Sequence, residues 1–131
     1  IEEGHSVGNH TNNHLNGWKC NNKEYIANMI EAKLKIGSNL FRPPYGRIKH
    51  SQINALQTLH ADTKIIMWDV LSGDFDINLS KQKCLDNVLK NAQNGSIIVF
   101  HDSTKAWERM EFALPRVLEH FSKIGFEFKA L

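Results

Sequence analysis

Apolar residues recur at helical spacing in four stretches of the chain, and we expect a helix in each. Asn22 is expected to cap the first helix, which runs to about Ile36 and ends at Gly37. Ser51 and Ser80 are expected to cap the second and third helices. The four predicted helices span residues 22–36, 51–59, the stretch after Ser80, and 108–123, where Pro115 either bends the helix or marks its true start.

Short apolar runs lie between these helices and predict strands, at residues 7–9, 40–41, 64–68, 96–100 and 126–130. The runs are continuous rather than alternating, which is typical of parallel strands covered by helices. A closed eight-stranded α/β barrel usually takes ~250 residues. The pattern therefore predicts an α/β fold, either an incomplete or smaller barrel or, as the alternative, a doubly wound open sheet.

Length and composition narrow the class of protein. The 131 residues fit one domain, so residues 1–131 are treated as a single unit. The net charge of +2 is too small to indicate a nucleic-acid partner or a membrane surface. No apolar run is long enough to span a bilayer. Cys20 and Cys84 lie outside any metal-binding spacing, and we expect two free thiols rather than a disulfide.

Three of the seven histidines lie within ten residues, at His5, His10 and His14. If the chain turned helical after Asn9, His10 and His14 would project from one face and chelate one divalent ion. The residue after His10 is Thr11, so the stretch lacks the glutamate base of helical zinc peptidases. The simpler alternative is a solvated polar turn.

Polar residues with acid, base or ligand chemistry follow the carboxyl ends of several predicted strands. Residues at this rim converge in α/β barrels and build the active site, so an enzyme is the favoured interpretation. Taken singly, Arg42 could be a surface arginine, Asp69 a loop acceptor and His101 a histidine at the edge of the core. The rim residues are His10, His14, Arg42, Asp69, Asp74, His101 and Asp102.

Four ordered segments resemble four of the five motifs of the polysaccharide deacetylase family, the NodB-homology enzymes of carbohydrate esterase family 4. They are residues 10–14 (HTNNH), 42–46 (RPPYG), 68–75 (WDVLSGDF) and 99–101 (VFH). The resemblance implies a deformed barrel of fewer than eight strands. It also implies metal-dependent removal of N- or O-acetyl groups from sugars.

The resemblance assigns a role to six residues of this sequence. His10 and His14 would be two of three protein ligands of a divalent metal, most simply zinc, with cobalt or nickel as alternatives. Arg42 would orient the catalytic aspartate, and the Tyr45 N–H would help to hold the oxyanion. Asp74 would pair with His101, the general acid on the leaving amine.

Two features depart from the family pattern. The opening motif, a strand that ends in an aspartate pair, is absent; it would supply the third ligand and the general base. Ile1–Glu3 before Gly4 resembles the end of a helix, so we expect a chain that begins in mid-domain, without its first strands. Such a chain is expected to be weakly active or inactive alone. Phe75 stands where the family usually has tryptophan.

The sequence thus predicts a metal-dependent deacetylase that acts on glycans containing N-acetylglucosamine, of the chitin or peptidoglycan type. The alternatives are a non-catalytic carbohydrate- or metal-binding module, and a metal-dependent amidase with a small substrate. The expected partner is an acetylated glycan, with no nucleic acid and no membrane span. This substrate class favours the cell envelope or the exterior, and the oligomeric state stays open.

Overall fold

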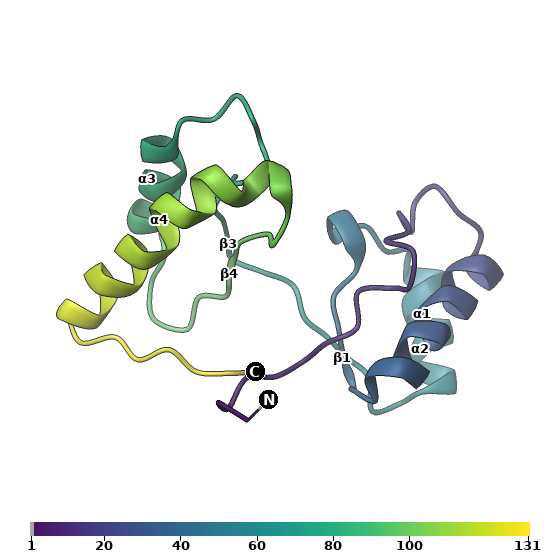
Figure 1. Ribbon diagram of the computed structural model, residues 1–131. Helices are drawn as coiled ribbons and strands as arrows, with labels where there is room; N and C mark the ends of the chain where they lie inside the picture. The colour runs from purple at the N-terminus through teal and green to yellow at the C-terminus, as the bar shows by residue number, and fades with distance from the viewer. Residues whose placement is uncertain (1) are drawn as a thin grey trace. The chain divides into compact units, whose positions relative to one another are not determined.

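The structure, a computed structural model, describes residues 2–131. The chain divides into two compact units. One comprises the residues up to Met67 together with Ala130–Leu131, and the other comprises Trp68–Lys129. Figure 1 shows the elements of each unit in chain order.

The first unit contains helix α1 (Asn22–Ile36), strand β1 (Leu40–Phe41), the 3₁₀ turn η1 (Pro44–Gly46), helix α2 (His50–Leu59) and strand β2 (Lys64–Ile65). β1 and β2 pair in parallel, and Asn9 forms an isolated parallel bridge to Phe41. Helices α1 and α2 pack together (Figure 1). The core of this unit consists of Tyr25, Ile26, Met29, Phe41 and Leu56.

Both ends of α1 follow from local chemistry. The Asn21 side chain accepts a hydrogen bond from the Glu24 N–H at 2.9 Å, so the cap lies one residue before the predicted Asn22. Gly37 ends the helix at φ 68°, a left-handed conformation that glycine adopts without strain. Helix α2 begins at His50 after Lys49, so the predicted cap at Ser51 is wrong.

The second unit contains strand β3 (Val70–Leu71), helix α3 (Lys81–Asn91), strand β4 (Ile98–Val99) and helix α4 (Thr104–Lys123). β3 and β4 pair in parallel, and α3 packs against α4 (Figure 1). Ser80 caps α3 as predicted, because its hydroxyl accepts from the Lys83 N–H at 3.1 Å. The core residues are Val70, Cys84, Leu85, Val88, Ala113, Val117 and Phe121.

Helix α4 begins at Thr104, four residues before the predicted start, and Pro115 lies inside it. Proline has no N–H, so the Glu111 carbonyl loses its helical partner at this point. One residue further along, Arg116 Nη1 donates to the Phe112 carbonyl at 2.7 Å and satisfies a neighbouring acceptor. The apolar face of α4 packs in the core, and this packing outweighs the cost of an internal proline.

The parallel pairing of an α/β fold is present, but the strand predictions need correction. Residues 64–68 and 96–100 form only two-residue strands, and 7–9 contributes only the bridge at Asn9. Val70–Leu71, where no strand is predicted, forms a strand. No strand forms at 126–130: the Phe126 ring lies 5.1 Å from the Phe121 ring, where it packs on the helical core.

Three further expectations concern the ends, the thiols and the membrane. Of the helix end predicted at Ile1–Glu3, Ile1 lies outside the described residues, and Glu2 and Glu3 form a turn. Cys20 and Cys84 are both free, as predicted. Within residues 2–131, no helix has the length and apolar character needed to cross a membrane.

Candidate active site

The histidine segment is an irregular loop, so the conditional expectation of a helix after Asn9 is wrong. Thr11 and His14 have φ of 61° and 53°, which interrupts helical geometry. The buried Asn9 side chain holds the loop: its Nδ2 donates to the Met29 carbonyl at 2.8 Å, and its Oδ1 accepts from the Thr11 N–H at 2.9 Å. The Asn28 side chain anchors the next turn through the Asn13 N–H.

This loop still brings His10 and His14 together, with ring centroids 4.9 Å apart. His10 Nδ1 lies 2.6 Å from the Arg42 carbonyl oxygen, which can only accept, so Nδ1 carries the proton. The Nε2 atom of a neutral His10 is then the nitrogen with a ligating lone pair. His14 Nδ1 lies 3.2 Å from the Tyr45 hydroxyl, which can either donate or accept.

The histidine pair fits a divalent metal in one respect. A backbone carbonyl that fixes the distal nitrogen is the usual second partner of a metal-bound histidine. Within residues 2–131, however, no three His, Cys, Asp or Glu side chains gather closely enough to hold an ion. Among the described residues, His10 and His14 therefore have no third side chain of these types beside them.

Arg42 lies directly beside this pair, at the end of β1. Its N–H donates to the Asn9 carbonyl at 2.9 Å, and its Nε and Nη2 reach the Ile66 and Met67 carbonyls at 3.2 and 3.5 Å. Partial burial lowers the pKa of the guanidinium, but from a value so high that it stays charged. The arginine is thus anchored on the backbone that directly follows β2 and is not a free surface residue.

Tyr45 lies in the turn that follows the two prolines. It adopts φ 60° and ψ 7°, inside a turn closed by bonds from the Gly46 and Arg47 N–H groups to the Pro43 and Pro44 carbonyls. These bonds do not use the Tyr45 N–H. The Tyr45 ring packs edge-on against His14, with centroids 4.7 Å apart. His10, His14, Arg42 and Tyr45 therefore form one cluster in the first unit.

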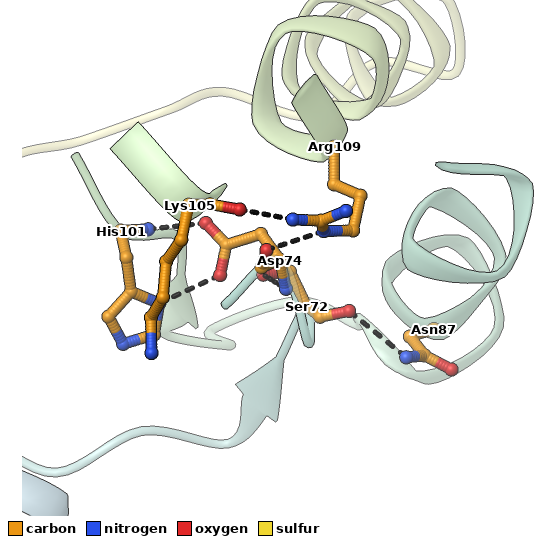
Figure 2. Close-up of polar contacts among 6 residues, drawn as sticks. All are labelled: Ser72, Asp74, Asn87, His101, Lys105 and Arg109. Atoms are coloured by element: carbon orange, nitrogen blue, oxygen red, sulfur yellow. Dashed lines mark hydrogen bonds and ion pairs between the residues drawn. The ribbon is translucent and has the colours of Figure 1, made fainter. Parts of the chain in front are cut away.

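The second unit holds Asp74 and His101. Asp74 is fully buried, and its Oδ1 lies 2.7 Å from His101 Nδ1. Its Oδ2 accepts the His101 backbone N–H at 2.5 Å (Figure 2). Both carboxylate oxygens therefore bind the same residue, and they fix the orientation of its ring.

Arg109 supports Asp74 and was not expected from the sequence. Its side chain is buried in α4; Nε donates to the Asp74 carbonyl at 2.7 Å, and Nη2 donates to the Lys105 carbonyl (Figure 2). The sequence does contain a signal: Arg109 lies on the same face of α4 as the buried Ala106, Ala113 and Val117. A charge on an apolar helix face needs a buried partner.

The loop before Asp74 is also held tightly. The Ser72 hydroxyl accepts from the Asp74 N–H at 3.3 Å, and Asn87 of α3 donates to the Ser72 carbonyl at 3.0 Å (Figure 2). Gly73 has φ 81°, and a β-carbon there would lie 2.8 Å from Leu79. Only glycine fits this position without strain.

Asp69 and Phe75 also lie in the second unit. Asp69 Oδ2 accepts the Ile97 N–H at 2.8 Å, so Asp69 binds the segment that leads into β4 rather than its own loop. Phe75 packs edge-on against the His101 ring, with centroids 5.2 Å apart. Phe75 therefore contacts the His101 ring directly.

Comparison with known proteins connects these clusters to one family. The family model described as polysaccharide deacetylase matches residues 1–63. A peptidoglycan-N-acetylglucosamine deacetylase of Bacillus cereus is 27% identical over 133 residues, which cover 98% of this chain and 62% of the relative. The chain belongs to the polysaccharide deacetylase family.

Solved structures of the family agree with the fold. The Bc1960 peptidoglycan N-acetylglucosamine deacetylase superposes with a TM-score of 0.89 at 28% identity, covering 99% of this chain and 63% of that one. A Bacillus anthracis protein described as a pseudoenzyme of carbohydrate esterase family 4 superposes with a TM-score of 0.78 at 19% identity, covering 96% and 44%. The chain spans less than two thirds of the length of these relatives.

Proposed function

We propose that this polysaccharide deacetylase chain belongs to a metal-dependent enzyme that hydrolyses acetyl groups from polysaccharides containing N-acetylglucosamine. The observation that carries the proposal is the buried Asp74 bound through both oxygens to His101. The similarity to the Bacillus cereus peptidoglycan-N-acetylglucosamine deacetylase supports the same reaction class. The glycan is of the chitin or peptidoglycan type.

His101 is proposed to be the general acid on the leaving amine. Asp74 engages Nδ1, so Nε2 is the nitrogen left to face a substrate, and the His101 side chain is 41% exposed. A carboxylate that accepts from Nδ1 holds the ring in one tautomer and stabilises the protonated ring. Positioned proton transfer of this kind contributes about 10²–10⁴-fold to a rate.

His10 and His14 are proposed to hold the metal, with zinc as the first candidate and cobalt or nickel as alternatives. When bound, the ion would polarise the acetyl carbonyl and lower the pKa of its water. The Arg42 carbonyl holds His10 in the tautomer that ligation through Nε2 requires. The third ligand and the general base are proposed to be the aspartates of the family's opening motif.

Tyr45 is proposed to stabilise the negative charge that develops on the acetyl oxygen, and Arg42 is proposed to act on the general base. The Tyr45 N–H, which the turn leaves unused, suits an oxyanion donor, and Pro43 and Pro44 stiffen the segment that presents it. Arg42 is proposed to orient the base aspartate. The barrel architecture and a location in the cell envelope or outside the cell remain parts of this proposal, and the partner is the acetylated glycan.

Acetate release tests the proposal. The protein in its full encoded length is incubated with a tetramer of N-acetylglucosamine, beside its His101→Ala variant. We expect release by the wild type and a loss of at least ~10²-fold in the variant. Glycan binding without acetate release by the wild type would favour the non-catalytic module. Release only from small acetamides would favour the amidase.

A further inference from the structure

The chain contains two asparagine–glycine pairs, Asn16–Gly17 and Asn94–Gly95, and each of the two units holds one of them. An asparagine that precedes a glycine can lose its side-chain amide without any enzyme. The backbone nitrogen of the glycine attacks the side-chain carbon of the asparagine, and no β-carbon of the glycine hinders the approach. The sequence makes both pairs candidates for this reaction, whereas the structure distinguishes between them.

Asn94 and Gly95 form the exposed turn between α3 and β4. The Ser96 N–H donates to the Gln93 carbonyl at 3.0 Å, Gly95 has a φ of 83°, and the φ of Asn94 is negative. These features define a type II turn with glycine at the third of its four positions. A β-carbon at Gly95 would meet no atom within 4 Å, so open space surrounds this part of the turn.

The two reacting groups of this turn are not held by the fold. Within residues 2–131, neither the Gly95 N–H nor the Asn94 side-chain amide makes a hydrogen bond. The turn is closed by the bond from Ser96 to Gln93 and by a bond from the Gln93 N–H to the Ser96 hydroxyl at 3.0 Å. Rotation of the peptide between Asn94 and Gly95 therefore opens only an exposed turn, whose hydrogen bonds water can replace.

The Asn16–Gly17 pair is held firmly in the first unit. Gly17 is buried, its N–H donates to the Arg47 carbonyl at 3.1 Å, and its carbonyl accepts from the buried Gln52 side chain at 2.9 Å. The Asn16 side-chain oxygen accepts the Trp18 N–H at 3.0 Å. A β-carbon on Gly17 would lie 2.4 Å from the Arg47 carbonyl oxygen, so this backbone is closely packed. Attack by the Gly17 nitrogen requires all of these contacts to open.

We propose that Asn94 is a site of spontaneous deamidation in the folded protein, and that the fold protects Asn16 from the same reaction. In the first step the Gly95 nitrogen loses its proton and bonds to the Asn94 Cγ atom, the bond from Cγ to the amide nitrogen breaks, and ammonia leaves. In the second step water, the one co-reactant, opens the resulting cyclic imide. Opening at Cγ gives an aspartyl residue, and opening at the backbone carbonyl gives an isoaspartyl residue.

Either product changes the turn between α3 and β4. A new carboxylate lies just beyond the C-terminal end of α3, where the helix carries a partial negative charge and disfavours an anion. The isoaspartyl product also lengthens the backbone, because the β-carbon of the residue becomes part of the main chain. We therefore expect the modified protein to be more acidic than fresh protein and to have a lower thermal midpoint.

A peptide map of the full-length protein, followed over time at mildly alkaline pH, tests the proposal. Mass spectrometry of the two peptides that contain the pairs reports the replacement of an amide by an acid. We expect modification of Asn94 to be at least about ten-fold faster than that of Asn16, because the hydrogen bonds of Gly17 must also open at Asn16. In protein unfolded by guanidinium the two rates should become similar, because both sites then present the same pair of residues.

Asn94→Gln supplies the matched variant. The longer side chain would have to close a larger and less favourable ring, so the acidic product from this turn should disappear. Asn94 is exposed and its side chain makes no hydrogen bond within the described part of the chain, so the variant should fold. Asn78→Gln, at an exposed asparagine that precedes a leucine, is the control and should leave the acidic product unchanged.

Equal rates at Asn94 and Asn16 in the folded protein would overturn the inference, as would a difference in rate that persists after unfolding. An acidic fraction whose thermal midpoint equals that of fresh protein would refute the expected effect on the turn. None of these measurements uses acetate release, so their outcome is independent of the proposed function.

Discussion

Asp74 shows most directly how single residues determine the chemistry of the second unit. An ionised carboxylate is costly to bury unless hydrogen bonds replace its water. Asp74 is fully buried, and its two oxygens accept from the His101 side chain and from the His101 backbone. Its carbonyl also accepts from Arg109. These bonds fix the position of the Asp74 carboxylate, and through it the position of the His101 ring.

Asp74→Asn removes the charge that holds the His101 ring. We expect acetate release by the full-length protein to fall by about 10²–10⁴-fold, because the ring loses both its fixed tautomer and its stabilised charge. Steady-state kinetics on the N-acetylglucosamine tetramer measures this. Asp69→Asn is the matched control, since the Asp69 side chain only accepts the Ile97 N–H and an amide oxygen can do the same. Equal losses in the two variants would contradict the assignment.

Arg109→Met tests whether the buried arginine positions Asp74. The variant loses the bond to the Asp74 carbonyl, so the free energy of unfolding should fall by about 1–3 kcal/mol. We also expect kcat to fall with little change in KM, because Arg109 is buried and acts through Asp74.

Arg109→Lys supplies the comparison for this variant. It retains the charge and one donor, and should recover part of kcat. A variant that loses stability while kcat is unchanged would show that Arg109 supports the fold alone.

At the scale of elements, α1 carries an unusual buried group. Tyr25 is completely buried in the core of the first unit, and its hydroxyl has no hydrogen-bond partner within residues 2–131. Leaving a buried hydroxyl unsatisfied costs about 1–3 kcal/mol. The ring itself packs edge-on with Phe41, at 6.3 Å between centroids. The ring stabilises the helix packing, whereas the hydroxyl opposes it.

Tyr25→Phe should therefore raise the free energy of unfolding, by about 1 kcal/mol. It should also change the response to alkali. Burial raises the pKa of Tyr25 well above its ordinary 10.0, so the unfolded chain ionises first as the pH rises. Stability is then fully present below pH 10 and falls above it, and the variant should lack this part of the fall.

Chemical denaturation of both proteins between neutral pH and pH 11 measures the two effects together. Cys20 and Cys84, whose pKa values burial also raises, remain in both proteins and cancel in the comparison. Parallel stability curves for wild type and variant would contradict the account.

The elements also show what local sequence determines. Helix α1 ends at Gly37 as predicted, because glycine tolerates a positive φ. Helix α3 begins after Ser80 as predicted, because the serine hydroxyl caps it. Both effects act over only three or four residues. Strand extent depends on pairing partners far away in sequence. The apolar run at 96–100 therefore predicted a strand but not its length, and 126–130 packs on α4 instead of pairing.

At the scale of the whole molecule, each of the two units holds its own cluster of candidate residues. His10, His14, Arg42 and Tyr45 cluster in the first, and Asp74 and His101 pair in the second. The positions of the predicted strand ends, together with the ordered motifs, predicted all six of these candidate residues from the sequence. The roles in catalysis stay predictions, while the contacts among them are observed within each unit.

The parts of the site that could not be predicted depend on tertiary contacts. The histidines meet through a loop with two left-handed residues rather than through a helix, and a β-branched residue such as Thr11 rarely adopts that conformation. Arg109 reaches the Asp74 carbonyl only because the buried face of α4 packs beside Asp74. Spacing along the chain identified the candidate residues, but not the geometry that brings them together within each unit.

Metal content and acetate release, measured together on the full-length protein, test the central claim most directly. We expect about one zinc, cobalt or nickel ion per chain, acetate release that a chelator abolishes and added metal restores, and loss of both properties in His10→Ala and His14→Ala. Acetate release that persists in metal-free protein, or metal retained in full after both histidines are replaced, would contradict the account.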